Sequence, residues 1–296
     1  MTEIANQLDQ SHKERSVDSN FRVCLDPKDA LNLVLERFPF KNYIDPSSNS
    51  HLSTASCVRR HLSPRAKILD FGSGPCDKTG VLQAMGFECS ALDDLQDAWH
   101  LKGDCRTRVQ AFAEDAGIHF TLARPGSTGF TYPKEHFDMV VLNDVVEHLH
   151  DSPRELLNDL LELVAPNGLM LITVPNAGNI RKRLALLCGG TNYQRFDTYY
   201  WYPGKWRGHV REYVKSDLLR LSDYLNVEVL ELHGCDQMLS GLAGLPRAVY
   251  LGVTNVLKGW KDTWILVARK RPGWMPRKDL APGAILSKPV TYLYGE

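Results

Sequence analysis

The sequence lacks an excess of charge of either sign and lacks paired cysteines. Its 35 basic and 35 acidic residues cancel. Because a protein that grips a polyanion by bulk charge needs a surplus of positive residues, nucleic acid is not the expected partner. The seven cysteines are scattered, with no Cys-x-x-Cys spacing. That usage favours reduced thiols in an intracellular protein over a disulfide framework.

Long apolar runs are also missing. No segment approaches the ~18–20 consecutive apolar residues that a helix needs to span a bilayer. Residues 1–19 are polar and lack the apolar core of a secretory signal. We therefore expect a cytoplasmic protein with no membrane span. The length of 296 residues and the hydrophobic fraction of 43% allow a sizeable core, either in one large domain with additions or in two small domains.

The segment Lys67–Asp77 combines an apolar run, an acidic residue and two glycines. Apolar residues lead to Asp70, and Gly72 and Gly74 follow, which predicts a buried strand, a tight loop and the start of a helix. Because glycine has no side chain to block a ligand, this pattern indicates a nucleotide-like cofactor beyond the strand end. NAD fits poorly, since Asp77 replaces the third glycine of its fingerprint. The alternative is an ordinary strand-turn-helix corner.

A second acidic site follows the next predicted strand, at residues 86–94. Asp93 lies 21 positions after Gly72, close to the ~20-residue interval at which Rossmann-like sites place the acid that binds ribose hydroxyls. A carboxylate accepts both hydrogen bonds of a ribose diol, so Asp93 is the predicted ribose ligand. Asp94 is the neighbour that could replace it, and a helix N-cap pair is the alternative.

A third segment predicts a strand, a helix and another strand in succession. Residues 137–149 begin apolar and end polar. Residues 154–163 then carry leucines on one stripe, which is typical of a helix packed on a sheet. The sequence Pro166-Asn167-Gly168 is expected to stop this helix before a buried strand at residues 169–176.

The Asp70-x-Gly72-x-Gly74 pattern resembles motif I of the class I S-adenosylmethionine-dependent methyltransferases, and the three segments follow in the order of that superfamily. The resemblance covers roughly residues 65–270. It implies an α/β fold of the Rossmann type, with a seven-stranded, mostly parallel sheet, helices on both faces and an antiparallel strand at one edge. It implies S-adenosylmethionine as the cofactor: the methionine part near Asp70, Gly72, Ser73 and Gly74, the ribose at Asp93, and the reacting end near Asn143.

Two positions depart from the pattern of that superfamily. Cys76 stands where a third glycine is common, which would narrow the loop. Arg124 and Pro125 stand where an acid often holds the adenine amine. These departures motivate one alternative function, that of a degenerate member of the fold that serves as a non-catalytic partner subunit.

Two histidines are candidates for the chemistry. The Glu147-His148 pair and residues 208–213 resemble the ubiquinone-biosynthesis O-methyltransferase-like group, of the methyltransferase domain 23 type. Removal of a hydroxyl proton suits histidine near neutral pH, so His148 and His209 are the predicted general bases. The alternatives are a structural hydrogen bond for His148 and a packing or capping role for His209.

The pattern Asp144-x-x-Glu147-His148 could instead hold a divalent cation such as magnesium. It resembles the metal triad of ubiquinone-type O-methyltransferases. With a distant histidine it also resembles the site of small-RNA 2′-O-methyltransferases, except that Asp144 replaces a glutamate. Because Glu-His pairs also occur in members of the superfamily without a metal, a metal is the lesser alternative. Zero net charge further weakens the RNA methyltransferase hypothesis.

The remaining segments are expected to surround a methyltransferase domain at residues 66–270. Residues 1–65 form a candidate helical lid, and residues 271–296 an extended tail. Residues 177–212, rich in aromatic and basic side chains, form an insertion after the fifth strand, on the side where a substrate pocket is expected. The apolar segment 238–260 is expected in the core. The alternatives are a dimer face and a contact surface for a hydrophobic substrate.

Together these features predict an S-adenosylmethionine-dependent methyltransferase that acts on a small-molecule acceptor. A phenol, a sugar or a lipid-linked compound would suit, and oxygen is favoured over nitrogen or carbon as the methylated atom. A metal-assisted RNA 2′-O-methyltransferase and a catalytically degenerate partner subunit remain the alternatives. The acceptor and the oligomeric state stay open, because pocket shape comes from segments without a readable code.

Overall fold

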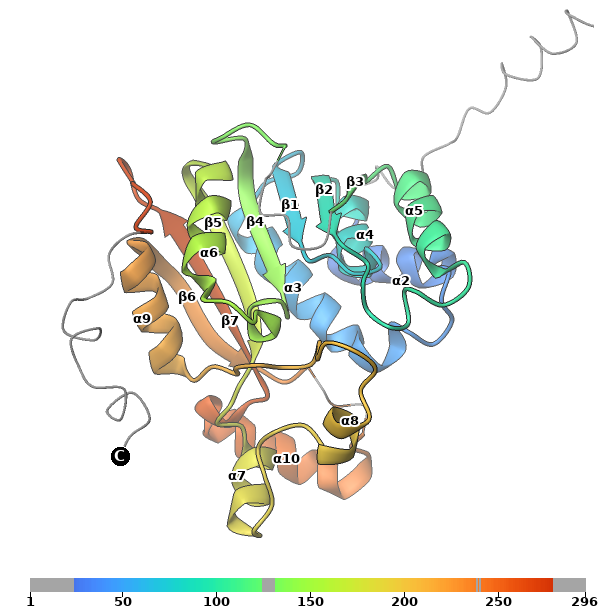
Figure 1. Ribbon diagram of the computed structural model, residues 1–296, viewed down its shortest axis with the longest axis vertical. Coiled ribbons are helices and arrows are strands. Elements are labelled where there is room, and N and C mark those ends of the chain that lie inside the picture. Colours follow the sequence, from blue (N-terminus) through green and yellow to red (C-terminus); the bar gives the residue numbers. More distant parts are fainter. Residues whose placement is uncertain (1–23, 124–130, 238, 240, 279–296) are drawn as a thin grey trace, which may run out of the picture.

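The computed structural model of this chain describes residues 24–123, 131–237, 239 and 241–278. Its centre is a seven-stranded sheet in the order β3-β2-β1-β4-β5-β7-β6 (Figure 1). The strands are β1 Lys67–Phe71, β2 Glu88–Asp93, β3 His119–Leu122, β4 Phe137–Asn143, β5 Val164–Pro175, β6 Val227–Cys235 and β7 Thr263–Lys270. The predicted fold class is confirmed. The antiparallel strand is β7, which pairs with both β5 and β6 and therefore lies one place inside the edge.

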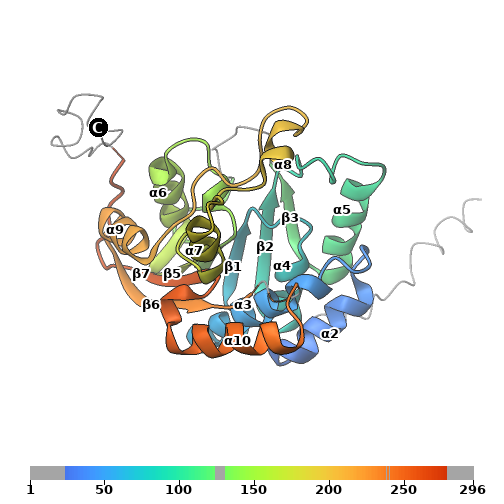
Figure 2. The ribbon, with the colours of Figure 1, turned by 90° about the horizontal axis from the view of Figure 1, so that it is seen from below.

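Helices cover both faces of this sheet (Figures 1 and 2). The helices of the described residues are α2 Pro27–Arg37, α3 Ser48–His61, α4 Asp77–Ala84, α5 Cys105–Ala116, α6 Pro153–Leu163, α7 Ile180–Leu187, α8 Phe196–Tyr200, α9 Lys215–Leu225 and α10 Gly244–Val256. Of these, α7, α8 and α10 lie below the sheet in Figure 1. One buried cluster joins α2, α3, α4 and α5 to one face of the sheet, and a second joins α6 and α9 to the other. Alternate strand residues enter the two clusters, as Ile68 and Leu69 do in β1.

Local sequence signals set the starts of the predicted helices. Asp26 caps α2 by accepting hydrogen bonds from two backbone N–H groups of its first turn. Ser152 caps α6 in the same way, with Pro153 at the first helical position. Leu157, Leu160 and Leu161 of α6 are buried, so the leucine stripe does face the sheet.

The end of α6 and the C-terminal segment differ from the sequence prediction. β5 begins at Val164, directly after α6, so Pro166-Asn167-Gly168 lies inside the strand, at a register shift against β4. Pairing on both sides of the bulge keeps these residues in the sheet. The start of the predicted extended tail is packed: Trp274 is buried, and its Nε1 donates to the backbone oxygen of Leu225 at 2.6 Å.

The expectation that segment 238–260 belongs to the core is wrong for α10, although Leu239 ahead of the helix is buried. In α10 only Tyr250 and Thr254 are buried, and their hydroxyls donate to the carboxylate of Asp236 at 3.0 Å each. Polar bonds thus hold the helix, while its apolar side chains face outward.

No helix in the described part of the chain is long and apolar enough to cross a membrane. The expectations about residues 1–19, about Arg124 and Pro125, and about residues 279–296 of the tail concern residues outside those that the structure describes.

Candidate active site

The glycine loop between β1 and α4 adopts a conformation that L side chains rarely take. Gly72 has φ +70°, and a Cβ there would lie 2.6 Å from Cγ2 of Val145, so glycine is required sterically at that position. Gly74 has φ +53°, yet a Cβ there would meet nothing within 4 Å. Cys76, at the position where the family often has glycine, also has positive φ (64°) and is fully buried. Its departure from the pattern therefore carries backbone strain.

Asp93 is bound to this loop. Its Oδ2 accepts a hydrogen bond from the backbone N–H of Gly74 at 2.8 Å, and its Oδ1 accepts one from Leu95 at 2.6 Å. Burial raises the pKa of the Asp93 carboxyl despite these two donors. The carboxylate is thus fixed in position at the end of β2 and keeps lone pairs for a ligand.

Two cavities meet at the glycine loop. The larger measures about 560 Å³ and the smaller about 350 Å³, and both are lined by Gly72, Gly74 and Asp144. The eight site residues predicted from the sequence all line one or the other: Asp70, Gly72, Ser73, Gly74, Asn143 and His209 the larger, and Gly72, Gly74, Asp93 and His148 the smaller. The structure therefore brings together side chains from β1, β2, β4 and the insertion.

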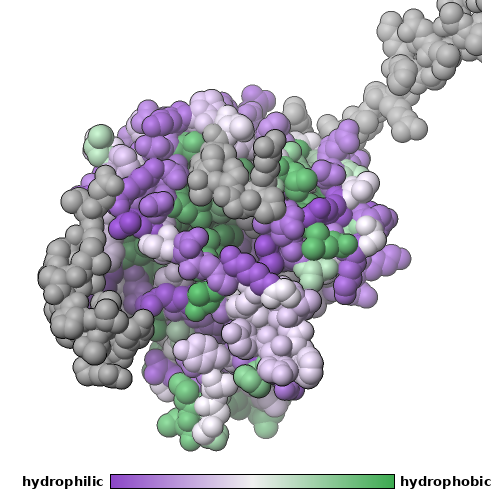
Figure 3. Space-filling view, in the orientation of Figure 1, coloured by the Kyte–Doolittle hydropathy of each residue, from purple (hydrophilic) through white to green (hydrophobic). Residues whose placement is uncertain are grey.

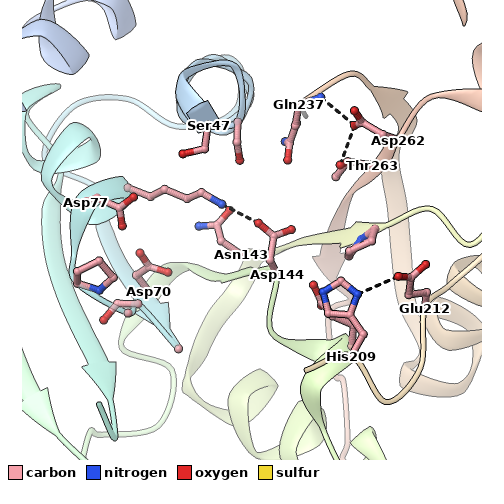
Figure 4. A pocket seen from close by; sticks show the side chains of 18 of the residues that line it. Ser47, Asp70, Asp77, Asn143, Asp144, His209, Glu212, Gln237, Asp262 and Thr263 are labelled. Atoms are coloured by element: carbon pink, nitrogen blue, oxygen red, sulfur yellow. Dashed lines mark hydrogen bonds and ion pairs between the residues drawn. The ribbon is translucent and has the colours of Figure 1, made fainter. Parts of the chain in front are cut away.

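The wall of the larger cavity on the β1 side carries acidic groups (Figure 4). Asp70 is buried and accepts a hydrogen bond from the Thr79 hydroxyl at 2.6 Å, and burial raises the pKa of its carboxyl to about 6. Asp144 lies 2.8 Å from Nζ of Lys78. Because the Lys78 ammonium compensates the charge of Asp144, the cavity is less negative than its carboxyl groups alone would make it.

The described part of the predicted N-terminal lid reaches the same cavity. The hydroxyl of Thr54, in α3, donates to Oδ1 of Asn143 at 3.2 Å. His51, also in α3, lies 2.7 Å from Asp77 at the start of α4. These contacts fasten α3 over the glycine loop. That residues 1–65 open and close as a lid stays a prediction.

His209 and Glu212 of the insertion lie on the opposite wall (Figure 4). Nδ1 of His209 is 2.8 Å from Oε1 of Glu212, and Lys182 of α7 forms an ion pair with the same carboxylate. Burial, with the nearby His148 and Lys182, lowers the pKa of His209 to about 4. The imidazole is therefore neutral at physiological pH, with its Nδ1–H donated to Glu212 and its Nε2 lone pair available.

His148 faces His209 and is fixed by the backbone of the insertion. Its Nδ1 donates to the backbone oxygen of Arg207 at 2.7 Å, and the two histidine rings pack edge to face with centroids 4.9 Å apart. His148 thus makes the structural hydrogen bond that was the alternative to a catalytic role. That bond uses Nδ1 and not Nε2.

Glu147 is the most unusual group of the site. It is fully buried, and among the residues that the structure describes neither of its carboxyl oxygens has a hydrogen-bond partner. Burial, together with the charge of Asp144, raises the pKa of Glu147 to about 8. Ligand atoms of Glu147, His148 and His209 lie within 4.8 Å of one another, whereas Asp144 is bound by Lys78. The grouping therefore differs from the predicted Asp144, Glu147, His148 triad, with His209 in the place of Asp144.

Residues 205–207 of the insertion line the smaller cavity, and the sequence did not predict this contribution to the site. The guanidinium of Arg207 lies 2.6 Å from Asp97 and 3.1 Å from Asp94. His150 Nε2 donates to the backbone oxygen of Trp206 at 2.7 Å. Only folding brings these partners together, and the only sequence signal was the basic, aromatic composition of residues 177–212.

Comparisons with known proteins agree with this geometry. Among solved structures, a SAM-dependent methyltransferase from Methanosarcina mazei is 13% identical, with a TM-score of 0.50, covering 73% of this chain and 97% of that one. The [4+2]-cyclase SpnF is 14% identical, with a TM-score of 0.52, covering 83% of this chain and 93% of that one. At these identities the likeness shows the fold alone. No curated protein matches the chain.

Protein families give the more specific result. Residues 48–232 match the family described as methyltransferase domain. The matched range contains the glycine loop, Asp93, the Glu147-His148 pair and the insertion with His209. The chain therefore belongs to the methyltransferase domain family, among the class I S-adenosylmethionine-dependent enzymes.

Proposed function

We propose that this enzyme transfers the methyl group of S-adenosylmethionine to a hydroxyl oxygen of a small-molecule acceptor. The observation that carries the proposal is the His209–Glu212 pair on the wall of the larger cavity. Glu212 occupies Nδ1 of His209 at 2.8 Å, so Nε2 is the nitrogen that can take a proton. The lowered pKa, about 4, keeps this nitrogen unprotonated at neutral pH, so it is free to accept the proton of a hydroxyl acceptor.

The two cavities suit the cofactor. Glycine at position 74 leaves open space beside the loop backbone, so a ligand can approach its N–H and C=O groups closely. Asp93 would accept the ribose hydroxyls in the smaller cavity, while Asp70, Ser73 and Asn143 would lie along the methionine part. Bound there, S-adenosylmethionine supplies an electrophilic methyl group on its sulfonium.

The protein residues around that methyl group would orient the acceptor and remove its proton. His209 Nε2 would accept the hydroxyl proton as the oxygen attacks in line with the bond from sulfur to methyl carbon, and orientation supplies much of the rate gain. Glu212 would hold the ring in the correct tautomer and stabilise the imidazolium that forms. Lys182 would keep Glu212 ionised through their ion pair.

A divalent cation is a second way to activate the hydroxyl, and the buried, unpaired carboxylate of Glu147 favours it. Glu147, His148 and His209 would hold the ion, since their ligand atoms lie within 4.8 Å of one another. A bound ion would polarise the acceptor oxygen and lower its pKa. His209 would then act as a ligand, and Lys78 would keep Asp144 turned away from the ion.

The first experiment is calorimetric titration with S-adenosylmethionine and, separately, with NAD. Binding of S-adenosylmethionine alone supports the site, and binding of neither favours the partner-subunit alternative. Transfer of a labelled methyl group is then measured on phenols, sugars, lipid-linked compounds and small RNAs, before and after treatment with EDTA. EDTA-resistant transfer to a small hydroxylated acceptor supports the histidine base, and restoration by added Mg²⁺ or Mn²⁺ supports the cation. Transfer to RNA alone would refute the small-molecule proposal.

A further inference from the structure

Exposed hydrophobic side chains gather at one end of the molecule, which we call the apolar end. It comprises α7, α8 with its flanking residues, and α10, which lie below the sheet in Figure 1; in Figure 2, seen from below, α7 lies between α8 and α10. Figure 3 shows hydrophobic side chains at this lower tip. Its members are each more than half exposed: Leu184, Leu186, Leu187, Tyr193, Phe196, Tyr199, Tyr200, Trp201, Leu245, Val249 and Val256. So large a group on one surface indicates a binding face.

Ring contacts join α7 to α10 and support α8. The guanidinium of Arg181, in α7, lies 5.0 Å from the ring centroid of Tyr250, in α10. The guanidinium of Arg183 lies 5.4 Å from the ring centroid of Trp260. On the side of α8, the rings of Tyr199 and Trp206 pack edge to face at 5.2 Å. The helices α7 and α10 are therefore held side by side, while α8 packs on Trp206 of its own insertion. The leucine, valine and aromatic side chains named above are exposed on all three helices and beside them.

The charge of this end differs from that of the whole chain. Residues 177–207 and 241–261 contain a single acidic residue, Asp197. Their basic residues are Arg181, Lys182, Arg183, Arg195, Lys205, Arg207, Arg247, Lys258 and Lys261. Three of these are paired with carboxylates outside the two segments: Lys182 with Glu212, Arg207 with Asp94 and Asp97, and Lys261 with Asp236. Lys205, Arg247 and Lys258 are exposed. The net charge of the whole sequence is zero, yet this end of the molecule is both apolar and basic.

We propose that the apolar end docks on a bilayer that contains anionic lipids. Leucine side chains can enter the acyl region, and tyrosine and tryptophan favour the boundary between acyl chains and headgroups, because their rings are apolar and their tips polar. Lysine and arginine extend their charged ends to lipid phosphates while their stems stay on apolar surface. The apolar end combines these three kinds of side chain on helices too short to span the bilayer, as docking at its surface requires.

Charge complementarity selects the bilayer over a second copy of the chain. A symmetric dimer would place the same surface against itself, which would bring the exposed Lys205, Arg247 and Lys258 of both copies together, while Asp197, the acidic residue of these segments, is paired with Arg195. Like charges in contact weaken such an association. An anionic lipid surface supplies the missing opposite charge.

The position of the apolar end also bears on the acceptor. Asn179, Arg181 and Lys182, at the start of α7, line the larger cavity. An amphiphilic acceptor held in the bilayer would thus enter the cavity beside His209. This extension to the acceptor rests on the proposed function, whereas docking itself requires no methyl transfer.

Vesicle sedimentation tests the docking with the full chain and without cofactor. The probes are vesicles of phosphatidylcholine alone and vesicles of phosphatidylcholine and phosphatidylglycerol in equal parts. Leu187→Glu/Trp201→Glu places two charges on the apolar end, on side chains 82% and 78% exposed. The matched control Leu219→Glu/Tyr224→Glu adds the same charges on α9, where the side chains are also exposed. Thermal unfolding checks that both variants are folded.

We expect the wild type and the control to bind the anionic vesicles, more weakly at high salt, and the Leu187→Glu/Trp201→Glu variant to bind at least tenfold more weakly. Absence of wild-type binding, equal binding by both double variants, or equal binding to the two vesicle types would overturn the proposal. Light scattering gives an independent outcome: a wild-type dimer that only the Leu187→Glu/Trp201→Glu variant loses would assign this face to a second copy. Because no cofactor or acceptor is present, failure here is distinct from failure of the methyl transfer proposal.

Discussion

Replacement of Gly74 by alanine separates the role of the glycine loop in folding from its role in binding. Gly74 has φ +53°, and a Cβ there would meet no protein atom within 4 Å. The backbone cost of alanine in this region is about 1–2 kcal/mol, equivalent to roughly 2–4 °C in Tm per kcal/mol for a domain of this size class. The new methyl group would project into the space next to the loop and keep ligand carbons about 3.5–4.0 Å away. We therefore expect a modest loss of stability and at least a tenfold, or about 1.4 kcal/mol, loss of S-adenosylmethionine affinity.

Gly103 provides the matched control for this substitution. It has φ +54°, a Cβ there would also meet nothing within 4 Å, and it lines neither cavity of the site. Gly103→Ala should therefore cost the same backbone energy and leave the dissociation constant unchanged. Calorimetry measures affinity, and thermal unfolding measures stability. If Gly74→Ala binds S-adenosylmethionine as the wild type does, the loop is not the cofactor cradle and the reasoning fails.

The other site residues give sharper expectations when compared in pairs. Asp93→Ala should weaken S-adenosylmethionine binding at least tenfold in calorimetry, because it removes the ribose acceptor, and Asp94→Ala should weaken it less; equal losses would contradict the assignment. His209→Ala should lower kcat by roughly 10²–10⁴-fold in a methyl transfer assay with little change in cofactor affinity, whereas parallel losses would indicate a structural role. Burial raises the pKa of Asp70 from 3.8 to about 6, so the folded state takes up a proton, and gains stability, as pH falls through that range. Chemical denaturation should show Asp70→Asn about 3 kcal/mol more stable than the wild type near pH 8 and no more stable near pH 4; a difference independent of pH would count against this.

The parts of the site that the sequence predicts are those with local causes. The strand, loop and helix at residues 67–77 follow from an apolar run and two glycines within a few positions, and φ +70° at Gly72 is the reason for glycine. The interval from Gly72 to Asp93 is likewise set by one helix between two parallel strands. Fold class and cofactor region could therefore be predicted before any tertiary contact was known.

The arrangement of His209 with Glu147 and His148 has no such local cause. His209 is near Glu147 because the backbone N–H of Val210 donates to the Glu147 carbonyl at 2.7 Å, a contact between segments far apart in the chain. No pattern indicates that Lys78 would hold Asp144 and leave His209 as the third member of the group. The pairing of His209 with Glu212 was not predictable either: the two residues are three positions apart, but in an irregular segment, and that spacing pairs side chains only on a helix.

The error on α10 has a different origin, and it connects composition to the proposed docking. Periodicity cannot distinguish a buried apolar helix from an apolar helix that faces outward, and a net charge of zero describes only the mean of the chain. Here apolar and basic residues coincide in two segments that are distant in sequence and adjacent in space, as the contact of Arg181 with Tyr250 shows. Averaged over the chain, each property suggests an ordinary soluble enzyme. On one end of the fold, beside the larger cavity, the same residues form a surface that is both apolar and basic, which is the combination that docking on an anionic bilayer requires.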